Sequence, residues 1–281
     1  MAQTSYTLGM QLPSHTLLAH NDAAASANKI HDDAVAQQYG FRGGLVPGVS
    51  VYAYMTYPLV YSLGARWLAQ GTAHVQLSKP VYAGDAVTVT GTVNAVDDAV
   101  LGFDIAGMNA AGVACGVGSA TLPSAVSTVP ALAEVPAGPR QAPQVPASWD
   151  AIVVGEPLPV LTLTVSPAEN AVYCQNHTDD LELYRGAHGY VHPGMLLHLC
   201  NRIFSGHFML GPWMHVGSNI ATYRACQVNE PLEVRGVPIQ KFEKRGHEFV
   251  VLDVLILADG AAAQRVQHTC IFRPRQSAPA G

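Results

Sequence analysis

The stretch Asn28-Lys29-Ile30-His31-Asp32-Asp33 and the turn Val46-Pro47-Gly48 decide the fold, because a similar pattern recurs later in the chain. The second copy comprises His177-Thr178-Asp179-Asp180 and the turn His192-Pro193-Gly194. An offset of 146 residues separates His31 from His177, and the same offset separates Gly48 from Gly194. A fixed period of this length is typical of a duplicated domain and is too long for a solenoid repeat. We therefore predict two copies of one unit of roughly 120 residues.

Other features repeat at nearly the same spacing. Trp67 and Trp213 each follow a Leu-Gly pair and are also 146 residues apart, whereas Val87–Gly91 and Leu232–Gly236 are 145 residues apart. Between the two copies the chain is rich in Pro and Ala, a composition that disfavours helices and central strands. We predict an N-terminal unit of residues 1–123, an extended linker of residues 124–159 and a C-terminal unit of residues 160–281.

Hydrophobic periodicity predicts one helix and four strands in each unit. The segment from Val49 to Leu63 has apolar residues on nearly every side, which indicates a buried helix, and Pro58 leaves a kink or an early end open. A second helix is predicted at 195–210, and strands at 73–77, 86–96, 101–108, 113–122, 220–224, 231–242, 248–257 and 265–273. A helix that is apolar all round needs cover on every side, so the sheet should wrap around it. The predicted class is α+β, with antiparallel sheets.

Composition restricts the class of function. Hydrophobic residues make up 49% of the chain and charged residues 12%, with a net charge of −5, so a nucleic-acid partner is not expected. The start of the chain has no signal-peptide pattern, and no apolar run is long enough for a membrane span, which predicts a cytoplasmic protein. The five cysteines have no paired spacing and should be buried free thiols. No metal-binding or nucleotide-binding motif occurs, so neither a metal nor a cofactor is expected.

The segment from Asn28 to Gly48 resembles the MaoC-like, (R)-specific enoyl-thioester hydratases and dehydratases. The pattern of that family is Asp-x-Asn-Pro-x-His-x-Asp, followed by a hydrophobic-His-Gly turn that opens a central helix. The resemblance extends to both copies and implies a double hot-dog fold, in which each unit is an antiparallel sheet wrapped around one helix. It also implies reversible addition of water to an α,β-unsaturated acyl thioester.

Carried over by position, the resemblance implies a role for each residue of the first copy. His31 is the acid/base residue, Asn28 holds the loop, and Gly48 begins the helix whose free N–H groups polarise the thioester carbonyl. The sequence departs from the family at the aspartate, which is replaced by Ser26. A serine can bind a water but cannot accept its proton at neutral pH, so His31 would act alone.

Several further residues are predicted to shape or contact the substrate. In the first unit these are Val46, Pro47 and Tyr52. In the second unit they are Asn176, His177, His192 and Gly194. We also expect Asp33 to cap the short helix that follows it.

Three functions remain open on this fold: a hydratase or dehydratase, a thioesterase, and a non-catalytic protein that binds acyl thioesters. The substrate would be an acyl-CoA or an acyl-carrier thioester. Basic residues are expected at the mouth of its site, but no spacing distinguishes one from another among Arg42, Arg66, Lys79, Arg185, Arg202 and Arg224. Because each chain already contains two units, we predict a monomer or a homodimer, with the working site in the half that contains His31.

Overall fold

The computed structural model describes residues 5–275, so the outermost residues of both predicted units lie outside it. The first half contains one long helix, several short ones and five strands. In chain order they are β1 (His15–Leu18), η1 (Lys29–His31), α1 (Asp33–Gln38), α2 (Gly48–Leu63), α3 (Ala65–Gln70), β2 (Thr72–Leu77), β3 (Ala86–Val96), β4 (Val100–Asn109) and β5 (Ala114–Pro123).

The second half repeats this plan after a long connection. The connection contains η2 (Leu132–Glu134) and β6 (Val145–Pro146). The elements that follow are β7 (Leu161–Thr164), α4 (Pro167–Asn176), η3 (Glu182–Tyr184), α5 (Pro193–His207), β8 (Phe208–Met209), β9 (Met214–Thr222), β10 (Pro231–Lys244), β11 (His247–Ala258) and β12 (Ala261–Arg273). The division at residues 124 and 160 remains a prediction.

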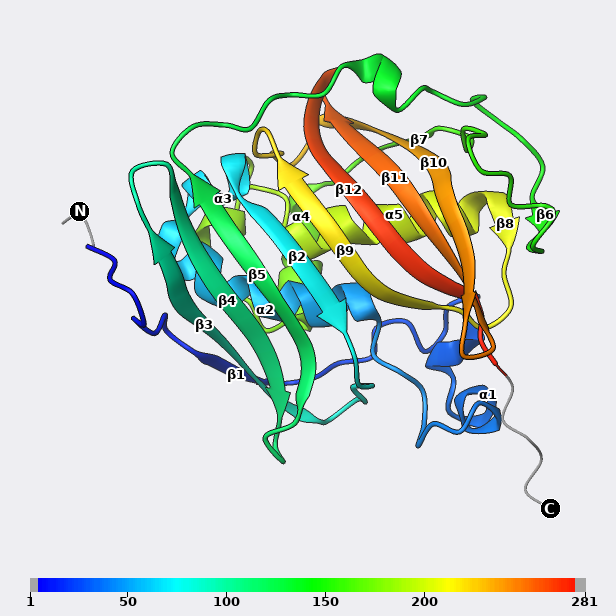
Figure 1. The fold of residues 1–281 in the computed structure, drawn as a ribbon, viewed down its shortest axis with the longest axis horizontal. Helices are drawn as coiled ribbons and strands as arrows, with labels where there is room; N and C mark the ends of the chain where they lie inside the picture. Colours follow the sequence, from blue (N-terminus) through cyan, green and yellow to red (C-terminus); the bar gives the residue numbers. More distant parts are fainter. Residues whose placement is uncertain (1–4, 276–281) are drawn as a thin grey trace.

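Both halves contribute to one antiparallel sheet of ten strands, in the order β1-β3-β4-β5-β2-β9-β12-β11-β10-β7. The halves meet where β2 pairs with β9, from Thr72 opposite Ala221 to Gln76 opposite Gly217. Figure 1 shows this continuous sheet, with the green linker running along one side of it. The predicted α+β class is therefore confirmed, and the two predicted sheets are joined into one.

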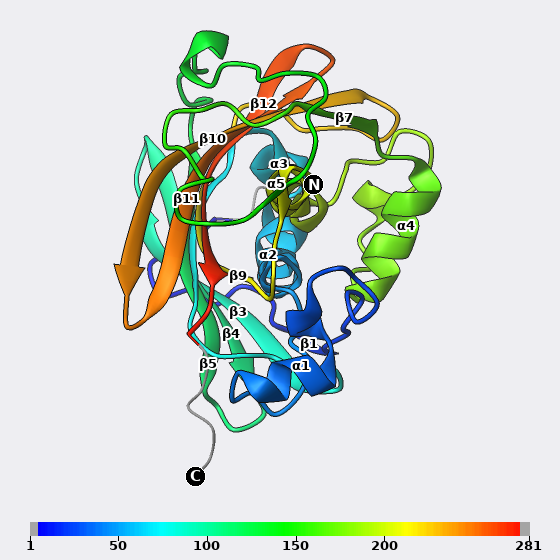
Figure 2. The same ribbon diagram turned by 90° about the vertical axis from the view of Figure 1, so that its right-hand side faces the viewer.

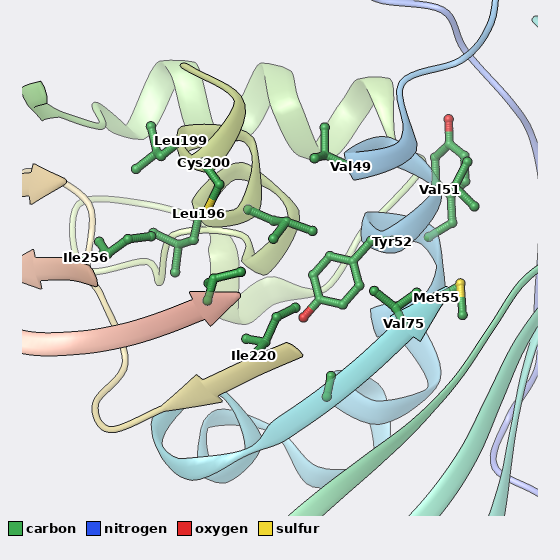
Figure 3. Packing of buried hydrophobic residues seen from close by; sticks show 14 of the residues in the cluster. Val49, Val51, Tyr52, Met55, Val75, Leu196, Leu199, Cys200, Ile220 and Ile256 are labelled. Carbon is green, nitrogen blue, oxygen red and sulfur yellow. The ribbon is translucent and has the colours of Figure 1, made fainter. Parts of the chain in front are cut away.

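The two long helices lie side by side against one face of the sheet, and α4 lies beyond them (Figure 2). Helix α2 is buried on nearly every side because the sheet covers one face and α5 covers another. Figure 3 shows Tyr52 of α2 pointing into the core that Leu196 and Cys200 of α5 also enter. Helix α2 continues through the buried Pro58 to Leu63, so the early end left open by the sequence does not occur.

The structure confirms most of the predicted elements and corrects others. Strand β3 has the predicted limits, whereas β9 begins at Met214, six residues before its predicted start. Strands β1 and β7 and helix α4 were not predicted. Helix α4 has a recognisable start signal, because Ser166 and Glu169 cap each other's backbone and Pro167 is the first helical residue.

All five cysteines are buried and free, as expected. Among residues 5–275, no helix combines the length and apolarity needed to span a membrane.

Candidate functional site

The loop that carries His31 is built from short-range hydrogen bonds. The Asn28 side chain accepts from the Ile30 N–H at the start of η1, and the Asp32 side chain accepts from the Val35 N–H at the start of α1. The prediction that Asp33 caps α1 is therefore wrong. The Asp33 carboxylate instead accepts from the Gly44 N–H at 2.7 Å, because its neighbour already occupies the capping position. Asp33 thereby ties the loop to the segment that leads into α2.

The segment before α2 passes very close to the His31 loop. A Cβ atom on Gly44 would lie 2.1 Å from the His31 carbonyl oxygen, so only glycine fits there. This close approach lets the Leu45 N–H donate to the Ile30 carbonyl at 3.1 Å. It also lets His31 Nδ1 donate to the Leu45 carbonyl at 2.7 Å. The Leu45 carbonyl therefore fixes the imidazole through Nδ1, and Nε2, on the opposite side of the ring, points away from this contact.

Asn28 fixes the state of the other ring nitrogen. Its Nδ2 donates to the Trp213 carbonyl at 2.9 Å, and its Oδ1 accepts from the Trp213 N–H at 3.2 Å. This two-point pairing with one residue's backbone allows a single orientation of the amide, which places Nδ2 3.2 Å from His31 Nε2. His31 Nε2 must then be an acceptor, so the imidazole is neutral with its proton on Nδ1. Burial lowers the pKa of His31, which favours the same state, although the Leu45 carbonyl partly opposes the shift.

His31 faces a cavity of about 280 Å³, which we call the His31 cavity. Of the predicted residues, it is lined by Asn28, His31, Val46, Pro47 and Gly48, and by Lys79, one of the basic residues expected at the mouth of the site. The second half completes its wall with Asn201, Trp213, Met214, His215, Val216, His247 and Ile271. The site is thus shared between the two halves, and no carboxylate from the described part of the chain lines it.

Gly48 supplies a donor at this cavity. It is the first residue of α2, so its N–H has no acceptor within the helix. A Cβ atom at this position would lie 2.5 Å from Leu77 and 2.8 Å from the His215 carbonyl oxygen, so glycine is needed for the helix to approach β2 and β9. The His31 cavity therefore combines a neutral imidazole with the positive end of a helix dipole.

The structure does not bring Ser26 or Tyr52 into the His31 cavity. The Ser26 hydroxyl donates to the Asn28 carbonyl at 3.3 Å and lines a different cavity of about 580 Å³, which we call the Ser26 cavity. Pro47 lines both cavities and lies between them. The Tyr52 ring is fully buried in the core, and burial raises the pKa of its hydroxyl.

The matching residues of the second half form a closed cluster. His177 and His192 are buried, and the His177 ring stacks on Tyr173 with ring centres 4.0 Å apart. Burial lowers the pKa of His177 to about 3. Asn176 is the last residue of α4, and neither it nor the two histidines lines any of the cavities described for this protein. A Cβ atom on Gly194 would lie 2.4 Å from that of Ala53, which shows how tightly α5 begins against α2.

The helix N-terminus of the second half is occupied by a side chain of the chain itself. His192 Nδ1 accepts from the Gly194 N–H at 3.0 Å, while His192 Nε2 donates to the buried Asp179 carboxylate at 3.1 Å. The corresponding residue in the first half is Val46, which has no polar group and cannot cap Gly48. The Gly48 N–H is therefore free at the His31 cavity, whereas the corresponding Gly194 N–H of the second half already donates to a side chain.

Sequence reasoning missed a buried polar chain behind the His31 cavity. His215 Nε2 and His268 Nδ1 contact the Ser218 hydroxyl at 2.9 and 3.0 Å, and His268 Nε2 contacts Asn201 Oδ1 at 2.8 Å. The two imidazoles stack with ring centres 4.2 Å apart, and burial lowers the pKa of His215 to about 4. These residues come from β9, β12 and α5, so no local motif in the sequence indicates the cluster.

No protein-family model and no curated protein matches this sequence. Solved structures do match its fold. A candidate MaoC domain dehydratase from Chloroflexus aurantiacus J-10-fl is similar over 96% of both chains, with a TM-score of 0.68 and 14% identity. A conserved hypothetical protein of Mycobacterium tuberculosis with a double hotdog fold matches 95% of this chain and 96% of its own, at TM-score 0.63 and 13% identity.

A candidate oleoyl thioesterase from Lactobacillus plantarum also shares the fold, with a TM-score of 0.55 and 10% identity over 95% of this chain and 98% of its own. The double hot-dog fold predicted from the sequence is therefore confirmed. The matching structures include both dehydratases and thioesterases, so the fold alone does not select between these two classes of reaction.

Proposed function

We propose that this protein is an acyl-thioester hydratase or dehydratase in which His31 is the single acid/base residue. The observation that carries the proposal is that two groups meet at one cavity. One is the His31 imidazole, whose Nε2 is unprotonated and can accept a proton, and the other is the N–H of Gly48 at the start of α2, which has no acceptor within the helix. Resemblance of the His31 loop to the hydratase motif supports the same reaction.

In the hydration direction, a water replaces Asn28 as the hydrogen-bond donor to His31 Nε2. As the water oxygen bonds to the β-carbon of the enoyl thioester, its proton passes to Nε2. The double bond shifts toward the thioester carbonyl, whose oxygen gains negative charge and accepts from the Gly48 N–H. The imidazolium then returns the proton to the α-carbon, so the atoms of one water are added and His31 is regenerated. Dehydration follows the same steps in reverse.

The half that contains His31 is the proposed working half. In the second half, His192 occupies the Gly194 N–H and His177 is packed against Tyr173, which leaves neither a free donor nor space for a thioester. The second half contributes the wall formed by Trp213 and His215.

The test is incubation of the purified protein with a panel of enoyl-CoA and 3-hydroxyacyl-CoA thioesters of several chain lengths. Enoyl absorbance and free thiol are followed together in the wild type, His31→Ala and His177→Ala. We expect a change of enoyl absorbance without thiol release, abolished in His31→Ala and retained in His177→Ala.

Each other outcome has a distinct meaning. Thiol release would identify a thioesterase, the class to which the Lactobacillus plantarum neighbour is assigned. Loss of turnover only in His177→Ala would move the working site to the second half. No turnover on any thioester would favour a non-catalytic protein that binds acyl thioesters. The lack of a carboxylate among the described residues of the His31 cavity supports that alternative.

A further inference from the structure

Asn201 connects the His31 cavity with the buried polar chain behind it. It lies on α5 and lines the cavity, and its Oδ1 is 2.8 Å from His268 Nε2 of β12. His268 Nδ1 contacts the Ser218 hydroxyl, which in turn contacts His215 Nε2. His215 also lines the cavity, so this series of side chains, which we call the Asn201 chain, begins and ends at the same wall.

The end of the Asn201 chain at His215 sets the direction of its hydrogen bonds. His215 Nδ1 is buried and has no hydrogen-bond partner among residues 5–275. A Cβ atom on Gly48 would lie 3.0 Å from this nitrogen, so the start of α2 covers it. A buried N–H without an acceptor is rarer in folded proteins than an acceptor without a donor. Because burial keeps the ring neutral, its one hydrogen is therefore on Nε2.

This assignment fixes every hydrogen along the Asn201 chain. His215 Nε2 donates to the Ser218 hydroxyl at 2.9 Å, and the hydroxyl donates to His268 Nδ1 at 3.0 Å. Burial lowers the pKa of His268 well below its ordinary value, so this ring is also neutral and carries its hydrogen on Nε2. His268 Nε2 therefore donates to Asn201, and only Oδ1 of the amide can accept.

The Nδ2 atom of Asn201 is then left for the His31 cavity. Asn201 is half-buried, and its Nδ2 has no hydrogen-bond partner in the part of the chain that the structure describes. The other amide at this cavity, that of Asn28, has no N–H to spare, because its Nδ2 donates to the Trp213 carbonyl and to His31 Nε2. A fixed N–H donor at a cavity wall stabilises an oxygen that gains negative charge during a reaction.

We propose that Asn201 Nδ2 is a second hydrogen-bond donor to the thioester carbonyl oxygen, in addition to the Gly48 N–H. The inference rests on the proposed function for the presence of that carbonyl. Gly48 belongs to the first half and Asn201 to the second, so the carbonyl is bound by both copies. Ser218 and His268 do not line the His31 cavity and are positioning residues, because they hold the amide in one orientation.

The first experiment observes the carbonyl directly in the full-length protein. The ligand is a ketone analogue of butyryl-CoA, in which a methylene replaces the thioester sulfur and the carbonyl carbon is labelled with carbon-13. It has no double bond to hydrate and no thioester to hydrolyse. Isotope-edited infrared spectra give the carbonyl stretching frequency of the free and bound ketone, because a hydrogen bond to the carbonyl oxygen lowers this frequency.

Four variants are compared with the wild type. Asn201→Asp keeps an oxygen facing His268 and replaces the donor nitrogen with a second oxygen, whereas Asn201→Leu removes both polar atoms. Ser218→Ala breaks the Asn201 chain. The control is Asn109→Asp, since Asn109 lines none of the cavities described above and its Oδ1 accepts from two backbone N–H groups, as an aspartate can. A thermal unfolding curve checks that each variant is folded, and the isosteric Asn201→Asp decides if Asn201→Leu is not.

We expect the bound ketone to absorb at a lower frequency than the free ketone in the wild type and the control. In both Asn201 variants the band should move back toward the free value, and in Ser218→Ala it should broaden because the amide is no longer fixed. Failure of the wild type to bind the ketone, or one frequency for the wild type and both Asn201 variants, would overturn the donor. An unchanged band in Ser218→Ala would overturn the positioning role of the Asn201 chain.

Turnover provides the second measurement. We expect kcat for hydration to fall about a hundredfold in Asn201→Asp, with a much smaller change in KM, because the donor acts on charge that develops in the transition state. The predicted infrared shifts in a protein that turns over no thioester would leave the donor standing while the proposed reaction fails. Hydration with an unchanged kcat in Asn201→Asp would do the opposite.

Discussion

Asn28 in the first half of the molecule pairs with Trp213 in the second half. Its side-chain amide donates to the Trp213 carbonyl at 2.9 Å and accepts from the Trp213 N–H at 3.2 Å. One side chain thereby joins the His31 loop to the start of β9 and sets which nitrogen of His31 carries the proton. The position of the His31 loop and the protonation state of its histidine depend on the same three hydrogen bonds.

Asn28→Asp tests this link. A carboxylate oxygen in place of Nδ2 would face the Trp213 carbonyl oxygen and His31 Nε2. We expect the free energy of unfolding to fall by about 1–3 kcal/mol, because a hydrogen bond becomes a repulsive contact. The new negative charge should also raise the pKa of His31, which a shift of the pH–rate profile to higher pH would report. An unchanged profile would show that Asn28 does not contact the working imidazole.

The pH dependence of hydration follows from the burial of His31. Because burial lowers its pKa below the ordinary value near 6.5, the neutral base persists as the pH falls through that value. We expect a hydration rate that is level from neutral pH down to about 6.5 and decreases only in more acidic solution. Initial rates with the best thioester between pH 5 and 8 measure this, and a loss of activity centred above pH 6.5 would contradict it.

Acid should destabilise the protein through buried His215. Its pKa is about 4 in the folded protein and near 6.5 in the unfolded chain, so between these values the unfolded chain binds the proton first. The contribution of neutral His215 to the free energy of unfolding is therefore complete above pH 6.5 and is lost as the pH falls toward 4. From pH 7 to pH 5 this histidine should account for about 2 kcal/mol of the lost unfolding free energy. Urea unfolding of the wild type and His215→Gln at both pH values should show the smaller loss in the variant.

The buried pair of His192 and Asp179 should contribute to stability and not to turnover. His192→Ala leaves the Asp179 carboxylate buried without its partner, and we expect a loss of about 3 kcal/mol. Adding Asp179→Asn should recover part of that loss, because the unpaired charge is gone. A double-mutant cycle in urea measures the coupling, while activity per folded molecule should remain close to wild type. A large loss of turnover in folded His192→Ala would show that the second half is catalytic.

Gly44→Ala should disable the site without unfolding the protein. Its Cβ atom would meet the His31 carbonyl oxygen at 2.1 Å, so the His31 loop must move. Because catalysis is sensitive to displacements of about 1 Å, we expect a drop in turnover of roughly a hundredfold. Gly211→Ala is the matched control, since nothing lies within 4 Å of the position its Cβ would take. Equal activity of the two variants would show that the His31 loop tolerates displacement.

The fold could be predicted from the sequence because its signals are local and occur twice. The alternation of Val87, Val89 and Val93 with threonines marks β3, and the recurring turn before Gly48 and Gly194 marks the starts of the two long helices. Strand β1 was missed because four residues with a single buried side chain give no period. The short pairings that bring β1 and β7 into the sheet are set by tertiary contacts.

Of the site, only the residues that lie close together in the sequence could be predicted. Asn28, His31 and Gly48 are near one another in the chain, and the structure places all three at one cavity. Ser26 was assigned by its place in a motif, but its hydroxyl turns back to the Asn28 carbonyl. His215 was missed because the imidazole on which it stacks, that of His268, belongs to another strand, β12.

The difference between Val46 and His192 has a consequence for how this molecule can change. In a dimer of identical chains, a single codon specifies the residue at both helix starts, so a histidine that stabilises one end would obstruct the other. Joining the two units in one polypeptide removes that symmetry, because each position then varies alone. One copy can keep a bare helix end for chemistry while the other acquires a side chain that closes it.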